Sequence, residues 1–301
     1  MRYIYTSYLP YSDRYAIKGI GYKRVVQHAK KTRQLRIEYQ HNESLSRGFQ
    51  GISIDEQECR EHFQGLVKDN LLDREERDDT LDQLRAKIHE SGFDATDGLM
   101  GDIQALEDDN IQVQNFRVGE AYAEVILEQA FSCRFYWNEL RDARNPRGNK
   151  TGADLVGFIE VEGQVLFLFG EVKTSSETAN RPPQVMTGAH GIESQLRDLY
   201  NNRTKRQILI SYLKSKMRLF PEGHPFKVNF DAGFRAYYSN PENYQLIGVL
   251  IRDIEHDERD LSLSYGRLST RILDPIGLKL LALYLPIQQK DWLNIINEEN
   301  E

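Results

Sequence analysis

The sequence predicts an α/β (α+β) fold in which helices flank a mixed sheet. Residues 152–176, "GADLVGFIEVEGQVLFLFGEVKTSS", form the most apolar stretch of the chain and are typical of two strands. Amphipathic helical patterns precede and follow them, at 116–131 and 191–202. A helix, two strands, a helix and a later strand in this order indicate an α/β or α+β core.

Composition narrows the class of protein. The 301 residues allow one large or two modest domains, and 40% hydrophobic with 28% charged residues is ordinary for a globular protein. The net charge of −7 argues against loose, charge-driven binding to nucleic acid or membrane, although a local basic groove is compatible with it. Cys59 and Cys133 lie far apart, which argues against a disulfide framework or a zinc site. We therefore expect a cytoplasmic protein without a membrane segment, since no apolar run approaches about 20 residues.

The first part of the chain changes character near residue 53. Residues 1–52 are strand-rich, with alternating patterns in "YIYTSYL" and "QLRIEYQ". Residues 53–112 are acidic, with leucines at helical spacing and Gly92 as a stop. The acidic run fits either a solvated helix face or a protein-binding surface. We expect an accessory region at 1–112 and a second domain, carrying the site, at 113–301.

The remaining elements follow from hydrophobic periodicity. Tyr122, Val125 and Ile126 should face inward from the helix at 116–131. The 191–202 helix presents an apolar face, the basic segment 203–218 continues as helix, and 244–253 should be a core strand. In the apolar segment 272–287, Pro275 is expected to begin a helix. The apolar face consists of Ile192, Leu196, Leu199 and Tyr200.

The central strands should form a hairpin with Glu162 and Gly163 as its turn, because glycine tolerates the positive φ that such turns need. In that register Asp154 lies directly opposite Glu171, with Cβ atoms about 5 Å apart. Lys173 follows Glu171 by two residues and shares its face. Three charges therefore meet at one end of an apolar hairpin.

Facing carboxylates repel each other, and burying them is costly. A divalent metal ion removes this conflict, and Mg²⁺ takes its remaining ligands from water and phosphate. A nearby lysine could orient a water molecule or neutralise phosphate charge, which is the logic of phosphodiester hydrolysis. The alternative is a salt-bridged trio in which Lys173 only neutralises Glu171. Lys173 is the one lysine of the chain with an acidic residue two positions before it.

These residues resemble the PD-(D/E)XK nuclease superfamily over roughly residues 115–215. The resemblance implies a restriction-endonuclease-like core, with Asp154 and Glu171 as ligands of Mg²⁺ or Mn²⁺ and Lys173 as the catalytic lysine. Ala153 stands where some members have proline. By the same resemblance, Glu120 on the preceding helix would support the metal.

Other features of the match remain open to two interpretations. On the following helix, Gln195 would lie near the phosphates, or it is a plain surface glutamine. Glu120 also belongs to a stripe with Glu124 and Glu128 that could be solvated. The order "GE…LE…GxD…GExK" further resembles the nuclease subunit of Hachiman-type antiphage defence systems, which works with a separate helicase.

Basic residues are concentrated locally, as phosphate contacts require. One cluster lies at 14–36 and another at 203–218, and a loop before Asp154 adds more. Solvated helix or strand edges and a plain connecting loop are the alternatives. The candidate nucleic-acid contacts are Arg147, Lys150, Arg203, Lys205 and Arg206.

The sequence thus predicts a metal-dependent deoxyribonuclease, an effector in antiphage defence whose activity a helicase or ATPase partner controls. The second candidate is a catalytically silent nucleic-acid-binding or scaffolding subunit with a nuclease-like fold. A third is an interaction protein whose central strands are only core.

Overall fold

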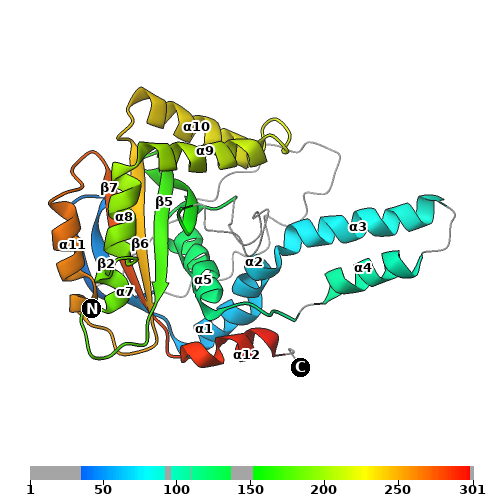
Figure 1. Cartoon of the computed structure of the whole chain (residues 1–301), viewed down its shortest axis with the longest axis horizontal. Helices are drawn as coiled ribbons and strands as arrows, with labels where there is room; N and C mark the ends of the chain where they lie inside the picture. Colours follow the sequence, from blue (N-terminus) through cyan, green and yellow to red (C-terminus); the bar gives the residue numbers. More distant parts are fainter. Residues whose placement is uncertain (1–34, 92–95, 109, 137–151, 299–301) are drawn as a thin grey trace.

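The computed structural model describes residues 35–91, 96–108, 110–136 and 152–298. At its centre lies a seven-stranded mixed sheet of order β1-β2-β7-β6-β5-β4-β3 (Figure 1). Strands β2, β7, β6 and β5 run parallel, whereas β1, β4 and β3 pair antiparallel with their neighbours. The strands are β1 Arg36–Asn42, β2 Arg47–Ser53, β3 Cys133–Arg134, β4 Leu155–Val161, β5 Gln164–Thr174, β6 Tyr244–Arg252 and β7 Gly277–Tyr284. The predicted α/β class is confirmed.

Strands β4 and β5 form the predicted hairpin. Glu162 and Gly163 both have positive φ, at 52° and 76°, as a two-residue hairpin turn of type I′ requires. Val161 pairs with Gln164, and the register continues without a bulge to Leu155 and Gly170. Asp154 and Glu171 would be the next pair in this register. The predicted register is therefore confirmed from the turn as far as Leu155 and Gly170, the pair next to these two acids.

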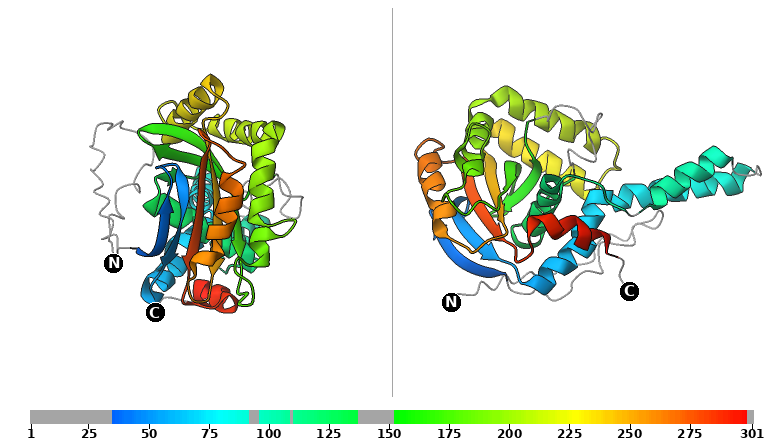
Figure 2. Two further views of the ribbon diagram at one scale, coloured as in Figure 1. Left: turned by 90° about the vertical axis from the view of Figure 1, so that its left-hand side faces the viewer. Right: turned by 60° about the horizontal axis from the view of Figure 1, so that its bottom comes forward.

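Helices cover both faces of the sheet. Helix α5 (Asn115–Ala130) packs on one face, and α8 (Ile192–Asn201), α9 (Arg203–Met217) and α10 (Pro225–Ser239) cover the other (Figure 2). These helices and β6 agree with the predicted elements at 116–131, 191–202, 203–218 and 244–253. Tyr122, Val125 and Ile126 are buried as predicted. Each face has its own apolar core.

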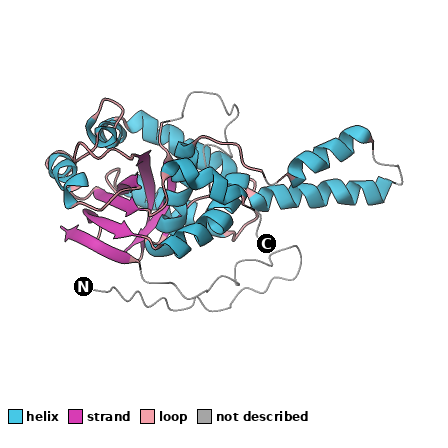
Figure 3. Cartoon of the chain, turned by 90° about the horizontal axis from the view of Figure 1, so that it is seen from below, coloured by secondary structure: helices cyan, strands magenta, loops and turns pink. Residues whose placement is uncertain are grey.

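The N-terminal region is divided between the sheet and an arm. Helix α1 (Glu56–His62), π-helix η1 (Phe63–Val67) and α2 (Lys68–Leu72) pack beside α5 and α12 (Trp292–Asn297). Helices α3 (Arg74–Ser91) and α4 (Asp97–Glu107) form a hairpin that projects from the body, which we call the arm (Figure 3). The boundary expected near residue 112 cuts across the sheet, because β2 pairs along its length with β7. The segment "YIYTSYL", Gly92 and most of the basic cluster at 14–36 lie outside the described residues.

The helix expected from Pro275 is wrong, since the segment forms strand β7. This strand lies between β2 and β6, and both of its faces are covered. A doubly covered parallel strand is apolar on both sides, so its sequence lacks the alternation that marks a half-exposed strand. The short helices are α7 Gln184–Thr187, η2 Glu258–Asp260, α11 Ser262–Ser269 and η3 Gln289–Asp291. No helix in the described part of the chain is long and apolar enough to span a bilayer.

Candidate metal and nucleic-acid site

Asp154, Glu171 and Lys173 meet at the carboxyl end of β5. Asp154 immediately precedes β4, and both carboxyl-bearing residues are only 5% exposed. The Lys173 ammonium lies 2.5 Å from Glu171 Oε1 and 3.8 Å from Asp154 Oδ2. The backbone N–H of Val172 donates to Asp154 Oδ2 at 3.0 Å and fixes that carboxylate. The three residues that the sequence singled out therefore form one compact cluster.

Strand alternation places this cluster on the face covered by α8. Phe167 and Phe169 on β5 belong to the core beneath α8–α10, and Glu171 follows them at the strand period. Gly248 on β6 is the register partner of Glu171, and a Cβ there would lie 2.5 Å from Ile192 Cγ2. The glycine lets α8 approach the sheet closely beside the buried carboxylate. The cluster thus lies between the hairpin and the start of α8.

Glu120 is not brought into this cluster. It lies on α5, which packs against the opposite face of the sheet, and it accepts from Arg117 Nη1 at 2.8 Å. Among the described residues, no three Asp, Glu, His or Cys side chains are grouped so as to hold a metal ion. The solvated stripe is not found either, because Glu120 and Glu124 are both buried. Helix packing from α2, where Asn70 contacts Glu124, accounts for part of this burial.

The two carboxylates nevertheless fit a magnesium-type site. Mg²⁺ is commonly held by one or two carboxylates, with water and substrate phosphates completing its shell. Asp154 and Glu171 supply such a pair at the end of a rigid hairpin. In this structure the Lys173 ammonium places a positive charge beside both carboxylates. Asp154 and Glu171 are the residues that could hold the ion.

Gln195 lies on α8, over the face of the sheet that carries Glu171, and its side chain is partly exposed. The same helix is anchored by a contact that the sequence did not reveal. Buried Glu193 accepts from Ser264 Oγ at 2.7 Å and from Arg267 Nη2 at 2.5 Å, both on α11. This anchor fixes the position of α8 and therefore that of Gln195.

The candidate phosphate contacts divide into different groups. Arg203 is exposed at the first turn of α9. Lys205 is partly buried and pairs with Asp198 Oδ2 at 2.7 Å, and its stem lies against Gly152, two residues before Asp154. Arg147 and Lys150 lie outside the described residues.

Arg206 is a structural residue in place of the expected phosphate contact. Its guanidinium is buried, donates to the carbonyls of Leu199 at 2.5 Å and Tyr200 at 2.6 Å, and stacks on the Tyr244 ring. These bonds satisfy carbonyl groups at the end of α8, which the helix leaves without intrahelical partners. A buried guanidinium with these partners is not available to a phosphate.

A buried ionic cluster lies beyond β5 and was not predicted. Arg252 and Asp260 are both fully buried, and Arg181 Nη1 lies 3.0 Å from Asp260 Oδ2. Arg252 also donates to Ser175 Oγ and to the Glu177 carbonyl. Burial lowers the pKa of Arg252 and raises the pKa of Asp260. The cluster fixes the loop that follows Lys173. The sequence feature that could have indicated this cluster is the polar run after the apolar segment 244–251.

Neither protein-family models nor curated proteins match this sequence.

Proposed function

We propose that this chain is a metal-dependent nuclease of the PD-(D/E)XK type that hydrolyses phosphodiester bonds in DNA. One observation carries the proposal: two buried carboxylates and a lysine converge at the end of an apolar hairpin. An apolar hairpin gains no stability from two facing acids, so their placement there calls for a chemical purpose. The resemblance of the same three residues to this nuclease superfamily supports the same conclusion.

Each residue of the site has a defined task in the proposal. Asp154 and Glu171 would hold Mg²⁺ or Mn²⁺. The ion, when bound, would polarise the phosphate and acidify a bound water molecule. Lys173 orients the attacking water and offsets negative charge on the phosphate. Gln195 contacts a neighbouring phosphate from α8, and the Val172 amide keeps Asp154 in position.

The start of α9 forms one side of the proposed DNA-binding surface. Arg203 is exposed there, and the Lys205 stem touches Gly152, so this helix end borders the segment that carries Asp154. Arg147 and Lys150, which lie outside the described residues, remain candidate DNA contacts on sequence grounds. Antiphage defence and control by a helicase or ATPase partner follow from the resemblance. A cytoplasmic location, expected from the two separated cysteines, belongs to the same proposal.

The second candidate is a catalytically silent subunit that binds DNA or acts as a scaffold. The contacts of Lys173 favour it, because one ammonium group pairs with both acids. No third carboxylate joins them in the described residues. In that case the trio is a structural ionic cluster that needs no metal. DNA binding would then be independent of divalent ions.

Cleavage of plasmid and linear DNA tests the proposal, with Mg²⁺, Mn²⁺ and EDTA beside a Glu171→Ala/Lys173→Ala variant. Metal-dependent cutting that the variant loses is the expected result. If no cutting occurs, Mn²⁺ titration calorimetry decides between a nuclease that waits for a partner and a silent subunit. A binding heat that disappears in the variant supports the nuclease, and its absence in the wild type refutes it.

A further inference from the structure

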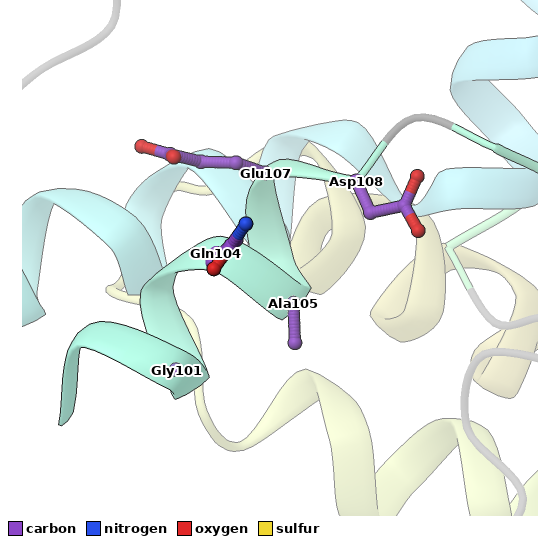
Figure 4. A pocket seen from close by; sticks show the side chains of 5 residues that line it. All are labelled: Gly101, Gln104, Ala105, Glu107 and Asp108. Carbon is purple, nitrogen blue, oxygen red and sulfur yellow. The ribbon is translucent and has the colours of Figure 1, made fainter. Parts of the chain in front are cut away.

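Two recesses in the described part of the chain differ in their free polar groups. One lies on α4 of the arm and is lined by Gly101, Gln104, Ala105, Glu107 and Asp108 (Figure 4). The Glu107 carboxylate accepts from Arg85 Nη2 of α3 at 2.6 Å, so its charge is already used within the arm. The other recess contains a buried acceptor that the described residues leave without a donor.

This second recess lies at the carboxyl ends of three parallel strands. The segments that follow β5, β6 and β7 line it, together with the first residue of α5. It is an open pocket of about 590 Å³, and small-molecule sites typically occupy roughly 300–1,000 Å³. Ligands of open α/β sheets bind outside the carboxyl ends of the strands, so its position is also that of a ligand pocket. The lining residues include Asn115, Ser176, Asp253, Ile254, Gln288 and Gln289.

Asp253 joins the three strand ends through one of its carboxylate oxygens. Oδ2 accepts from Ser176 Oγ and from the Gln289 backbone N–H, each at 2.9 Å. Oδ1 is buried, and no group of the described residues donates to it. A buried carboxylate oxygen without a donor is costly, and native structures rarely contain one. The pocket therefore offers one unused acceptor, on a side chain that two hydrogen bonds hold in place.

Donors and an apolar surface surround this acceptor. The side-chain amides of Asn115 and Gln288 make no hydrogen bond within the described residues, and each can donate to a carbonyl or a ring nitrogen. Ile254 adds a partly exposed apolar side chain. An ion or a single amine would use one of these groups and leave the rest unpaired. The combination suits a planar heterocycle with donors on one edge and acceptors on another.

We propose that this pocket binds a guanine base. The Watson–Crick edge of guanine carries two adjacent donors, N1–H and the 2-amino group, and both suit Asp253 Oδ1. Adenine and cytosine place a ring-nitrogen acceptor beside their amino group, and thymine has a carbonyl on each side of its N–H. Each of these bases therefore sets a lone pair against the carboxylate. The guanine acceptors O6 and N7 suit the amides of Asn115 and Gln288.

The base belongs either to a free nucleotide or to a DNA strand at the neighbouring cluster. The Gln289 amide links the two places, because it donates at 3.2 Å to Oγ1 of Thr174, the residue after Lys173. Gln288 is exposed, and side-chain rotamers commonly change on binding, so a donor can approach Oδ1 from the pocket. Binding in EDTA tests the pocket apart from the proposed cleavage, since no divalent ion takes part.

Calorimetric titration of the full-length chain in EDTA with GMP, AMP, CMP and TMP is the first test. GMP should bind at least about tenfold more tightly than the other three, because hydrogen bonds to a base edge discriminate by such factors. The variant Asp253→Asn keeps an acceptor for Ser176 and Gln289 but turns an amide donor toward the guanine donors. Its affinity for GMP should fall at least about tenfold.

Xanthosine monophosphate separates recognition from a structural role of Asp253. Xanthine has a carbonyl in place of the 2-amino group, so it should bind Asp253→Asn more tightly than it binds the wild type. A loss of packing alone weakens both ligands. Glu255→Gln is the matched control, since Glu255 is an exposed carboxylate on the same loop. Its affinity for GMP should equal that of the wild type.

Fluorescence anisotropy in EDTA identifies the source of the base. A short thymine strand with one central guanine should bind more tightly than thymine alone, and GMP should compete, if the base belongs to DNA. Equal binding of the two strands, with GMP still bound, assigns the pocket to a free nucleotide. Wild type that prefers neither GMP at about 1 mM nor the guanine strand would overturn the proposal, whether or not Asp253→Asn folds. Undiminished GMP affinity in a folded Asp253→Asn would overturn it too.

Discussion

The ammonium nitrogen of Lys173 lies 2.5 Å from Glu171 Oε1, although the two residues stand on the same strand and the same face. The same nitrogen is 3.8 Å from Asp154 Oδ2. One partly exposed cation therefore lies beside two buried carboxylates. The stability of this end of the hairpin should therefore depend on whether the Lys173 ammonium or a divalent metal ion supplies positive charge there.

Replacing Lys173 by methionine should expose that dependence. Without metal, the two carboxylates lose the Lys173 cation, and the free energy of unfolding should fall by about 1–3 kcal/mol. A divalent ion can take over the compensating charge, so Mg²⁺ should stabilise this variant more than the wild type. Urea unfolding in EDTA and in Mg²⁺ measures both effects. Lys290→Met is the control, because Lys290 is exposed at the surface. Equal losses with and without metal would make Lys173 a purely structural residue.

Glu171→Gln keeps the volume of the side chain and removes its charge. The lost pairing with Lys173 and the relieved repulsion from Asp154 oppose each other, so metal-free stability should change by less than about 1 kcal/mol. Cleavage should fall at least about a hundredfold, because a metal contact contributes several kcal/mol of charge stabilisation. Paired urea-unfolding and cleavage assays measure the two quantities. Glu160→Gln on the exposed side of the same hairpin should change neither. Retained cleavage in Glu171→Gln would remove Glu171 from the proposed metal site.

Local sequence patterns predicted the hairpin correctly. The features that were not predicted depend on contacts between residues far apart in the sequence. The turn at Glu162 and Gly163 sets the β4–β5 register within a few residues. Segment β7 is a strand because it pairs with β2 and β6, which lie elsewhere in the chain. Its leucine-rich sequence alone is compatible with either a helix or a strand. The burial of Glu124 likewise depends on α2, which precedes α5 by more than forty residues.

The inward position of Arg206 could have been recognised. Arg206, Leu209, Ile210 and Leu213 follow one another at helical spacing, and all four are buried. A basic residue in phase with an apolar face is directed toward the body, whatever the charge of its neighbours. The helical position of Arg206 therefore indicated that its side chain is buried. A count of the basic residues in the segment does not distinguish buried from exposed positions.

The same substitution should therefore affect folding stability at Arg206 and DNA binding at Arg203. Arg206→Met leaves the carbonyls of Leu199 and Tyr200 without their donors, and we expect a loss of about 2–4 kcal/mol in unfolding free energy. Arg203→Met should change stability by less than about 0.5 kcal/mol. It should weaken DNA binding and reduce the slope of log affinity against log salt by about one. Thermal melting and fluorescence anisotropy separate the two. An unchanged salt slope would remove Arg203 from the DNA-binding surface.

His62 should make the packing of α1 against α5 sensitive to acid. Its Nδ1 lies 3.0 Å from the Tyr122 hydroxyl in the apolar core, and burial lowers the pKa of His62 below 6.5, although nearby Glu61 and Asp55 oppose the shift. A histidine with a depressed pKa is neutral in both states above the unfolded value. As the pH falls below about 6.5, the unfolded chain takes up the proton more readily than the folded one.

Stability should therefore be constant above neutrality and decrease as the pH falls through the interval below 6.5. Urea unfolding of wild type and His62→Gln at pH 7.5, 6.5 and 5.5 measures this slope. The variant should be less stable at pH 7.5, because it loses a packed ring, but its stability should decline less between pH 7.5 and 5.5. His190→Gln is the matched control, since His190 is exposed just before α8 on the other side of the sheet from α5. Parallel pH profiles for wild type and His62→Gln would show that other groups cause the acid sensitivity.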